Sequence, residues 1–208
     1  MNAEDVIWQC LEKAVYRFNR SNDSHSLLCP RCENPSTKAE KAAASERAIA
    51  YGLAFYLESE LRSVGLVSDL GPMIVDCEYN RHLAGEKSFA ERAEDRIKEI
   101  VKKARRRELE ADQDGFYVFS VAPDIVVHQR RTDVNNLLVV ELKKRSNPET
   151  ENYDRLKLEL FTKSRLNDEG YGYKFGAWVV AEDDWREGDR KLAIIAQYRD
   201  GKDKLLAP

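Results

Sequence analysis

The sequence lacks several features that would place it in a familiar class of protein. No apolar run approaches the length of a membrane span, and the N-terminus has no signal-peptide core, so we expect a cytoplasmic protein without a membrane partner. The phosphate-loop pattern G-x-x-x-x-G-K-[ST] and the Rossmann glycine pattern are both missing, which leaves ATP- or NAD-driven chemistry without support. A net charge of −3 argues against a strongly basic nucleic-acid protein, although it leaves room for local basic patches.

Cysteine is also scarce, and among the four residues only Cys29 and Cys32 form a C-x-x-C pair. A zinc site needs four ligands, but the sequence has no second C-x-x-C or H-x-H partner, and His25 would supply a third ligand at best. A redox pair is less favoured still, because no predicted strand precedes the two cysteines. We therefore interpret them as a reduced loop pair outside the candidate site.

What the chain does contain predicts one α/β domain over residues 1–208. Apolar residues at helical spacing predict helices over 3–19, 37–63, 88–112 and 147–168, with loop chemistry over 19–38. Apolar runs predict strands over 71–81, 116–129, 135–144, 173–183 and 191–200. We expect a sheet of four to five strands flanked by helices on both faces, because the strands are apolar on both faces. Residues 1–36 would be an N-terminal helix and loop extension, and 82–115 a helical insertion.

Two of the predicted strands carry charges that a buried strand normally avoids. Asp124 follows Pro123, which should break its strand, and Glu141 lies in the next strand with Lys143 two positions later. Because side chains alternate between the faces of a strand, Asp124, Glu141 and Lys143 can converge if the strands are neighbours. A divalent cation removes the repulsion between two carboxylates, and their oxygens suit Mg²⁺ or Mn²⁺. The alternative is a salt bridge of Lys143 with one carboxylate.

These residues, in "APDIVVH" and "LLVVELKK", resemble the motif of the PD-(D/E)XK nuclease superfamily. In combination with "NDSHSLL", "SERAIAYGLAFYL" and "VDCEYNR", they also resemble a group of small uncharacterised bacterial members of this superfamily. The resemblance implies a restriction-endonuclease-like core, in which a helix, a three-strand meander, a helix and a strand follow one another in a mixed sheet. It also implies a Mg²⁺- or Mn²⁺-dependent nuclease, for which DNA is favoured over RNA as the substrate. Asp124 and Glu141 would hold the metal, and Lys143 would assist the attacking water. Glu46 would complete the metal site, although a first-turn glutamate also simply favours the helix dipole.

Three further residues are candidates for substrate contact. His128 shares a face with Asp124 and is either at the edge of the site or a partly exposed strand-end histidine. The resemblance places Tyr153 and Lys157 on a helix that faces the site, where Lys157 would contact a phosphate or simply be solvated. The basic run over 102–110 either contacts a nucleic-acid backbone or forms an ordinary solvated helix face.

The same features also allow a function without catalysis. A nuclease-fold module that binds a protein or nucleic-acid partner would explain the acidic net charge and the absence of a recognisable DNA-binding appendage. A homodimer also remains open, because nucleases that cut both strands often dimerise.

Overall fold

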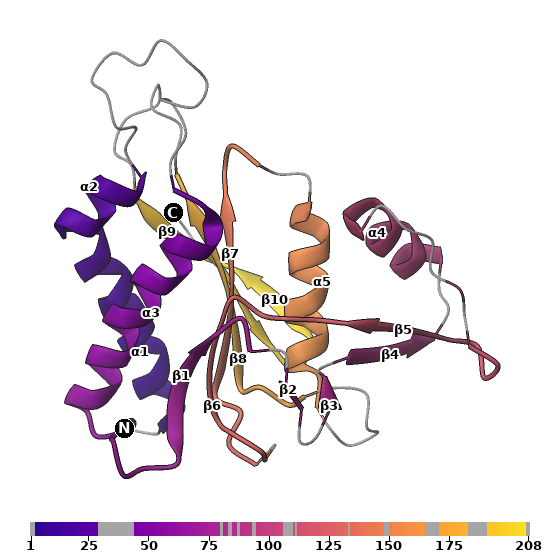
Figure 1. Cartoon of the computed structure of the whole chain (residues 1–208), viewed down its shortest axis with the longest axis horizontal. Coiled ribbons are helices and arrows are strands. Elements are labelled where there is room, and N and C mark those ends of the chain that lie inside the picture. The colour runs from indigo at the N-terminus through magenta and orange to yellow at the C-terminus, as the bar shows by residue number, and fades with distance from the viewer. Residues whose placement is uncertain are drawn as a thin grey trace.

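The computed structural model centres on a six-stranded mixed sheet with helices on both faces (Figure 1). It describes residues 3–28, 44–79, 81–82, 85–86, 88–92, 95–105, 110, 112–132, 134–147, 150–164, 171–182 and 191–206. The strand order is β1-β6-β7-β8-β9-β10. These strands are β1 (Met73–Cys77), β6 (Ile125–Gln129), β7 (Leu138–Lys144), β8 (Phe175–Ala181), β9 (Leu192–Arg199) and β10 (Lys202–Leu205).

The α/β class is confirmed, but the expected number of strands in the main sheet is wrong. The additional strand is β10, which pairs antiparallel with β9 at the edge of the sheet. All four residues of β10 are exposed, and three of them are charged, so the segment carries none of the apolar signal that predicts a strand.

The sheet consists of an antiparallel meander joined by a helical crossover to a second set of strands. Strands β1, β6 and β7 form an antiparallel meander, although β1 and β6 are separated in sequence by an insertion. Helix α5 (Glu151–Thr162) then crosses over, and β8 joins parallel to β7. This crossover is the connection that two parallel neighbouring strands require. Strand β9 returns antiparallel to β8.

Each face of the sheet has its own hydrophobic core. Helices α1 (Ala3–Asn19) and α3 (Glu46–Ser63) pack over Ile125 and Val127, whereas Val126 faces the core beneath α5. This alternation follows from the two-residue period of a strand, and it explains why β6 is apolar at consecutive positions. A fully buried side chain of this size contributes about 1.5–3 kcal/mol relative to an exposed one. The expectation of helices on both faces is therefore confirmed.

The start of α3 is set by Ser45, whose side chain accepts a hydrogen bond of 3.2 Å from the backbone N–H of Ala48. This is an N-cap, and it places Glu46 in the first turn. The expected helical residues 37–43 lie outside the described part of the chain. Between α1 and α3, helix α2 (Asn22–Leu28) forms where we expected a loop. The Ser21 hydroxyl accepts from the Ser24 N–H, so a residue typical of loops here supports a helix.

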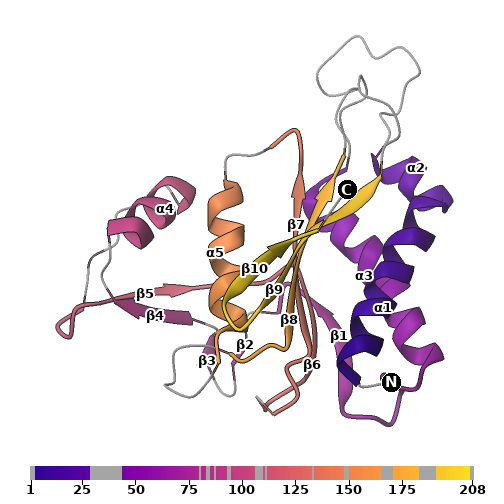
Figure 2. The same ribbon diagram turned by 180° about the vertical axis from the view of Figure 1, so that it is seen from behind.

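The insertion between β1 and β6 is not the single helix expected over 88–112. It contains β2 (Arg81–His82), β3 (Gly85–Glu86), β4 (Ser88–Arg92), α4 (Asp95–Arg105) and β5 (Phe116–Ser120). Strands β4 and β5 form an antiparallel arm that extends away from the main sheet, and α4 lies beside α5 (Figures 1 and 2). The helix prediction was wrong over β4. Phe89 belongs to a strand there, and its ring packs against other aromatic rings, with its centroid 4.9 Å from that of Phe161. The break at Pro123 is confirmed, since β5 and β6 belong to different sheets.

Among the described residues, no helix combines the length and apolar character needed to cross a membrane.

Candidate functional site

Four carboxylates and two lysines meet near the carboxyl end of β7, and we call them the acidic–lysine cluster. Its members are Glu46, Asp124, Glu141, Lys143, Asp154 and Lys157. They come from the first turn of α3, the residue before β6, β7 itself and α5. The structure thus brings together all four residues that the sequence analysis assigned to a metal site or to catalysis, and adds two from α5.

Glu141 is the most deeply buried member of the acidic–lysine cluster. Its side chain is almost completely inaccessible, and Lys157 Nζ lies 2.5 Å from Oε2. The other oxygen, Oε1, is buried without a hydrogen-bond partner among the described residues. Burial raises the pKa of Glu141 well above its usual value; Lys157 opposes this shift, whereas Asp124 and Asp154 add to it. Glu141 is therefore a carboxylate with an unused oxygen and a shortage of positive charge.

Lys157 is buried rather than solvated, which contradicts one of the expected alternatives. Its ammonium lies 2.5 Å from Glu141 and 3.1 Å from Asp154 Oδ1, and it also lies 5.4 Å from the ring centroid of Tyr153. Burial alone would lower the pKa of Lys157, but the carboxylates of Glu141, Asp154 and Asp124 outweigh it and raise the pKa. The raised pKa favours the charged form of Lys157, which offsets the charge of one acid of the cluster.

Asp124 occupies the position directly before β6, one residue beyond the pair Ile125–Val140. Its Oδ2 accepts a hydrogen bond of 2.7 Å from the backbone N–H of Leu142. Burial raises the pKa of Asp124 to about 6, although Lys157 and the Leu142 N–H act in the opposite direction. The nearby carboxylates Asp154 and Glu46 raise it further. Asp124 is therefore held by the backbone of the strand that carries Glu141.

Lys143 pairs with Glu46, and not with either strand carboxylate in the way that the salt-bridge alternative supposed. Its Nζ lies 3.1 Å from Glu46 Oε1 and 3.2 Å from Oε2, and it donates a hydrogen bond of 2.8 Å to Thr150 Oγ1. The Glu46 carboxylate also accepts 2.9 Å from the N–H of Lys144. Glu46 thus ties the first turn of α3 to the end of β7, which is more than a favourable interaction with the helix dipole.

Asp154 and Thr150 were missed by the sequence analysis. Asp154 lies 3.7 Å from Lys143 and accepts a 3.3 Å hydrogen bond from Thr150, so it connects the two lysines of the cluster. A signal was present, because Asp154, Lys157, Leu158 and Phe161 recur at the spacing of one helix face, and the last two are fully buried. Charged residues on a buried face indicate a polar site.

The donor atoms of the cluster fit a hard divalent cation. Four carboxylates against two ammonium groups leave a formal charge of −2 when all are ionised, and carboxylate oxygen is the ligand that Mg²⁺ and Mn²⁺ prefer. The buried Oε1 of Glu141 also lacks a partner within the described chain. In the present side-chain positions, no group of three or more acidic, histidine or cysteine residues among those described is arranged so that it could hold a metal ion. Lys143 and Lys157 hold Glu46 and Glu141, two of the carboxylates that a cation would use.

His128 belongs to a different group of residues. It is 3% exposed, so the expectation of a partly exposed histidine is wrong. Its Nε2 lies 3.1 Å from Asp76 Oδ2, and Arg130 Nε donates to the same oxygen at 2.8 Å. Tyr79 packs edge-on against the His128 ring, with centroids 4.5 Å apart. The contacts of His128 with Asp76 and Tyr79 therefore join β6 to β1 and to the residues directly after it, away from the acidic–lysine cluster.

Asp76→Asn should lower the free energy of unfolding by about 2 kcal/mol at neutral pH, and the difference should disappear in acid. Although burial raises the pKa of Asp76, hydrogen bonds from His128 and Arg130 prevail and lower it from 3.8 to about 2. Stability from a lowered pKa is present above 3.8 and is lost as the pH falls towards 2. Urea unfolding of both proteins at several pH values measures this; a difference that persists in acid would contradict the electrostatic cause.

The pair Cys29 and Cys32 lies outside the described residues, as does the side chain of His25.

No protein-family model matches the chain, and searches of curated proteins and of solved structures found no match. Any function is therefore argued from the acidic–lysine cluster and its surroundings.

Proposed function

We propose that the protein is a metal-dependent nuclease that hydrolyses phosphodiester bonds, in DNA in preference to RNA, at the acidic–lysine cluster. The observation that carries the proposal is the meeting of Asp124, Glu141 and Lys143 at neighbouring ends of β6 and β7. A buried carboxylate with an unpartnered oxygen is costly unless it serves a ligand or a reaction. Such an arrangement has the parts that metal-assisted hydrolysis requires.

The order of elements supports a restriction-endonuclease-like core. Helix α3, the meander β1-β6-β7, the crossover α5 and the parallel strand β8 follow one another in the order that the resemblance to PD-(D/E)XK nucleases implies. In that correspondence the arm β4–β5 and helix α4 are additions between the first two strands of the meander. Glu46 would then occupy the first core helix, next to the lysine of the motif.

The residues of the chain have separable roles in this reaction. A Mg²⁺ or Mn²⁺ ion bound by Glu46, Asp124 and Glu141 would supply Lewis-acid activation of the phosphodiester and the attacking water. Lys143, steadied by Thr150, presents an ammonium that can hydrogen-bond the water and offset charge developing on the phosphate. Lys157 favours the ionised form of Glu141 in surroundings that otherwise raise its pKa.

Purified protein should cut DNA only when Mg²⁺ or Mn²⁺ is present, and EDTA should abolish the cutting. The assay is gel analysis of supercoiled, linear duplex and single-stranded DNA, with RNA in parallel, because it also shows strandedness and the preference for DNA. Calcium serves as a control, since it takes oxygen ligands but has looser geometry than Mg²⁺. Cutting that continues unchanged in EDTA would contradict the proposal.

One observation favours a second function, a catalytically inactive module of the same fold that binds a protein or nucleic-acid partner. The ion pair of Lys157 with Glu141 already satisfies one oxygen of a carboxylate that would bind metal. Titration calorimetry with Mg²⁺ and Mn²⁺ separates the two functions. Absence of binding, together with unchanged folding stability in chelator, would favour the module, whereas binding that is lost in Asp124→Asn would favour the nuclease.

A further inference from the structure

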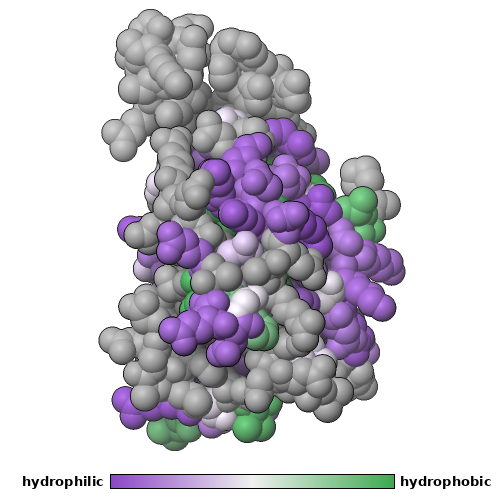
Figure 3. All heavy atoms as spheres, turned by 90° about the vertical axis from the view of Figure 1, so that its right-hand side faces the viewer, coloured by the Kyte–Doolittle hydropathy of each residue, from purple (hydrophilic) through white to green (hydrophobic). Residues whose placement is uncertain are grey.

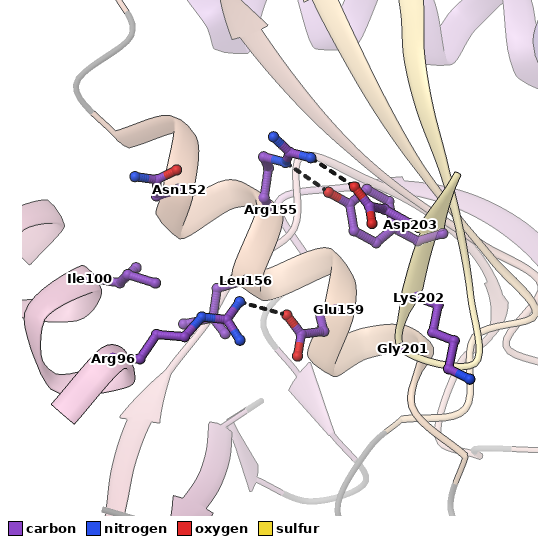
Figure 4. Close-up of a pocket in the computed structure, with 10 residues that line it drawn as sticks. Arg96, Ile100, Asn152, Arg155, Leu156, Glu159, Gly201, Lys202 and Asp203 are labelled. Atoms are coloured by element: carbon purple, nitrogen blue, oxygen red, sulfur yellow. Dashed lines mark hydrogen bonds and ion pairs between the residues drawn. The ribbon is translucent and has the colours of Figure 1, made fainter. Parts of the chain in front are cut away.

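Two adjoining cavities form a groove between α4 and α5, and we call them the α4–α5 groove. The larger, of about 570 Å³, continues to the β9–β10 turn; the smaller, of about 380 Å³, extends along α4. Both are lined by Ile100 of α4 and Asn152 of α5, so they share a boundary. Figure 4 shows the larger cavity, with Arg96 and Ile100 reaching from α4 and Arg155 standing on α5.

The smaller cavity of the groove borders two residues that contact the acidic–lysine cluster. Thr150 lines the smaller cavity and accepts the hydrogen bond from Lys143, and Tyr153 lines the same cavity with its ring 5.4 Å from Lys157 Nζ. A ligand in the smaller cavity therefore lies next to residues that touch both lysines of the cluster. The groove thus passes beside the cluster, between α4 and α5.

The charge of the groove is positive, although the chain as a whole carries −3. Its five cationic side chains outnumber the three acidic ones, Glu99, Glu159 and Asp203. The cationic residues are Arg96, Lys102, Lys103, Arg155 and Lys202. Figure 3 shows this side of the molecule, where hydrophilic side chains gather. Such a local excess of positive charge matches a polyanion.

The arginines are held in place, whereas two lysines are available. Arg155 donates to Tyr198 OH at 3.1 Å and to Asp203 at 2.7 Å, and Arg96 lies 3.1 Å from Glu159. These contacts leave other N–H donors of each guanidinium for a ligand. Lys103 and Lys202 are exposed and have no ion-pair partner within the described residues. They can contact a phosphate without breaking an existing bond.

Apolar and aromatic surface lies between these charges. Ile100 borders both cavities and the half-buried Tyr153 borders the smaller, whereas Tyr198, at the larger cavity, is only 3% exposed and serves as a partner of Arg155. A cationic groove that also presents Ile100 and the ring of Tyr153 suits a single strand, whose phosphates meet the cations while an unstacked base meets these side chains. Each cavity is within the size of a small-ligand site, about 300–1,000 Å³, which accommodates nucleotides of one strand rather than a duplex.

We propose that the α4–α5 groove binds one strand of nucleic acid and leads it, single-stranded, to the acidic–lysine cluster. This inference rests on the proposed nuclease function for the destination of the strand, but the groove itself is tested without cleavage. Helix α4 belongs to the insertion between β1 and β6, so the insertion would confer the preference for single strands.

The test is the binding of fluorescein-labelled oligothymidylate, measured by fluorescence anisotropy in EDTA over a range of KCl concentrations. The variant Lys103→Gln/Lys202→Gln should bind about tenfold more weakly, and its salt slope should fall by about 1.4, or about 0.7 per lost phosphate contact. The matched control Lys13→Gln/Lys174→Gln removes two exposed lysines, one on α1 across the sheet and one before β8. It should bind like the wild type.

Equal affinity and salt slope in the groove variant and the wild type would overturn the inference, as would equal binding of a duplex and a single strand. Thermal melts of both variants verify that folding is unchanged. Groove-dependent binding by a protein that never cuts DNA would overturn the nuclease and leave the groove standing. Metal-dependent cutting that is indifferent to Lys103 and Lys202 would overturn the groove alone.

Discussion

Asp124→Asn should reduce metal-dependent cutting of DNA about 1,000-fold or more, without loss of folding stability. The amide retains an oxygen that can accept the hydrogen bond from the Leu142 N–H, so the local geometry is kept. It removes a negative charge that the buried site tolerates poorly, since burial raises the pKa of Asp124 to about 6. The variant therefore separates the role of the charge from that of the shape. Initial rates of plasmid nicking and urea unfolding curves measure the two effects.

The matched control is Asp69→Asn, which makes the same chemical change at a carboxylate that is 86% exposed. It should cut DNA at the wild-type rate. Lys143→Met should lose activity to a similar extent as Asp124→Asn, because it removes the ammonium held by Glu46 and Thr150. If Asp124→Asn and Asp69→Asn cut equally well, the activity comes from a contaminant and the assignment of the site is wrong.

Lys157→Met should lower the free energy of unfolding by about 3–5 kcal/mol, which for a chain of this length is roughly 10 °C in melting temperature. Methionine preserves the apolar stem of the side chain but removes the charge that faces Glu141 and Asp154. Glu141 then remains buried without a compensating cation, and Asp154 keeps only the more distant Lys143, at 3.7 Å. Breaking a buried ion pair from one side is costly for this reason, whereas the pair as a whole contributes little. Chemical unfolding followed by circular dichroism measures the loss.

Two comparisons make the result of Lys157→Met specific. Arg62→Met removes the cation of an exposed network with Glu58 and Asp69, and it should cost no more than about 1 kcal/mol. The double variant Lys157→Met/Glu141→Gln should recover part of the stability, because the uncompensated charge is gone. If Lys157→Met is as mild as Arg62→Met, the buried pair does not have the structural importance inferred for it.

The sequence allowed the strand pair and its charges to be predicted because both depend on local patterns. Pro123 ends one apolar run and Glu141 lies in the next, so alternation sufficed to put Asp124 and Glu141 on one side of adjacent strands. Elements with a weak or mixed hydrophobic pattern were predicted wrongly: the polar strand β10 was not expected, and the charged strand β4 was expected to be helical.

The environment of Lys157 was not predictable, and the reason is physical. A lysine on an amphipathic helix is usually solvated, and only the depth of α5 against β7 buries this one beside Glu141. The buried environment of His128 was not predictable for the same reason, because its partner Asp76 lies 52 positions away in sequence. Partner choice depends on the distances between packed elements, which periodicity does not encode.

By itself the sequence determined the α/β class, the covering of both faces of the sheet, and the placing of Asp124, Glu141 and Lys143 on neighbouring strands. These follow from hydrophobic periodicity and strand alternation, which are local properties of the chain. Only the tertiary structure decided which acid each lysine neutralises. Lys143 meets Glu46 across 97 positions of sequence, and Glu141 is left with one buried oxygen that no described residue satisfies. Burial and long-range packing set these contacts, because the cost of a charge depends on what surrounds it.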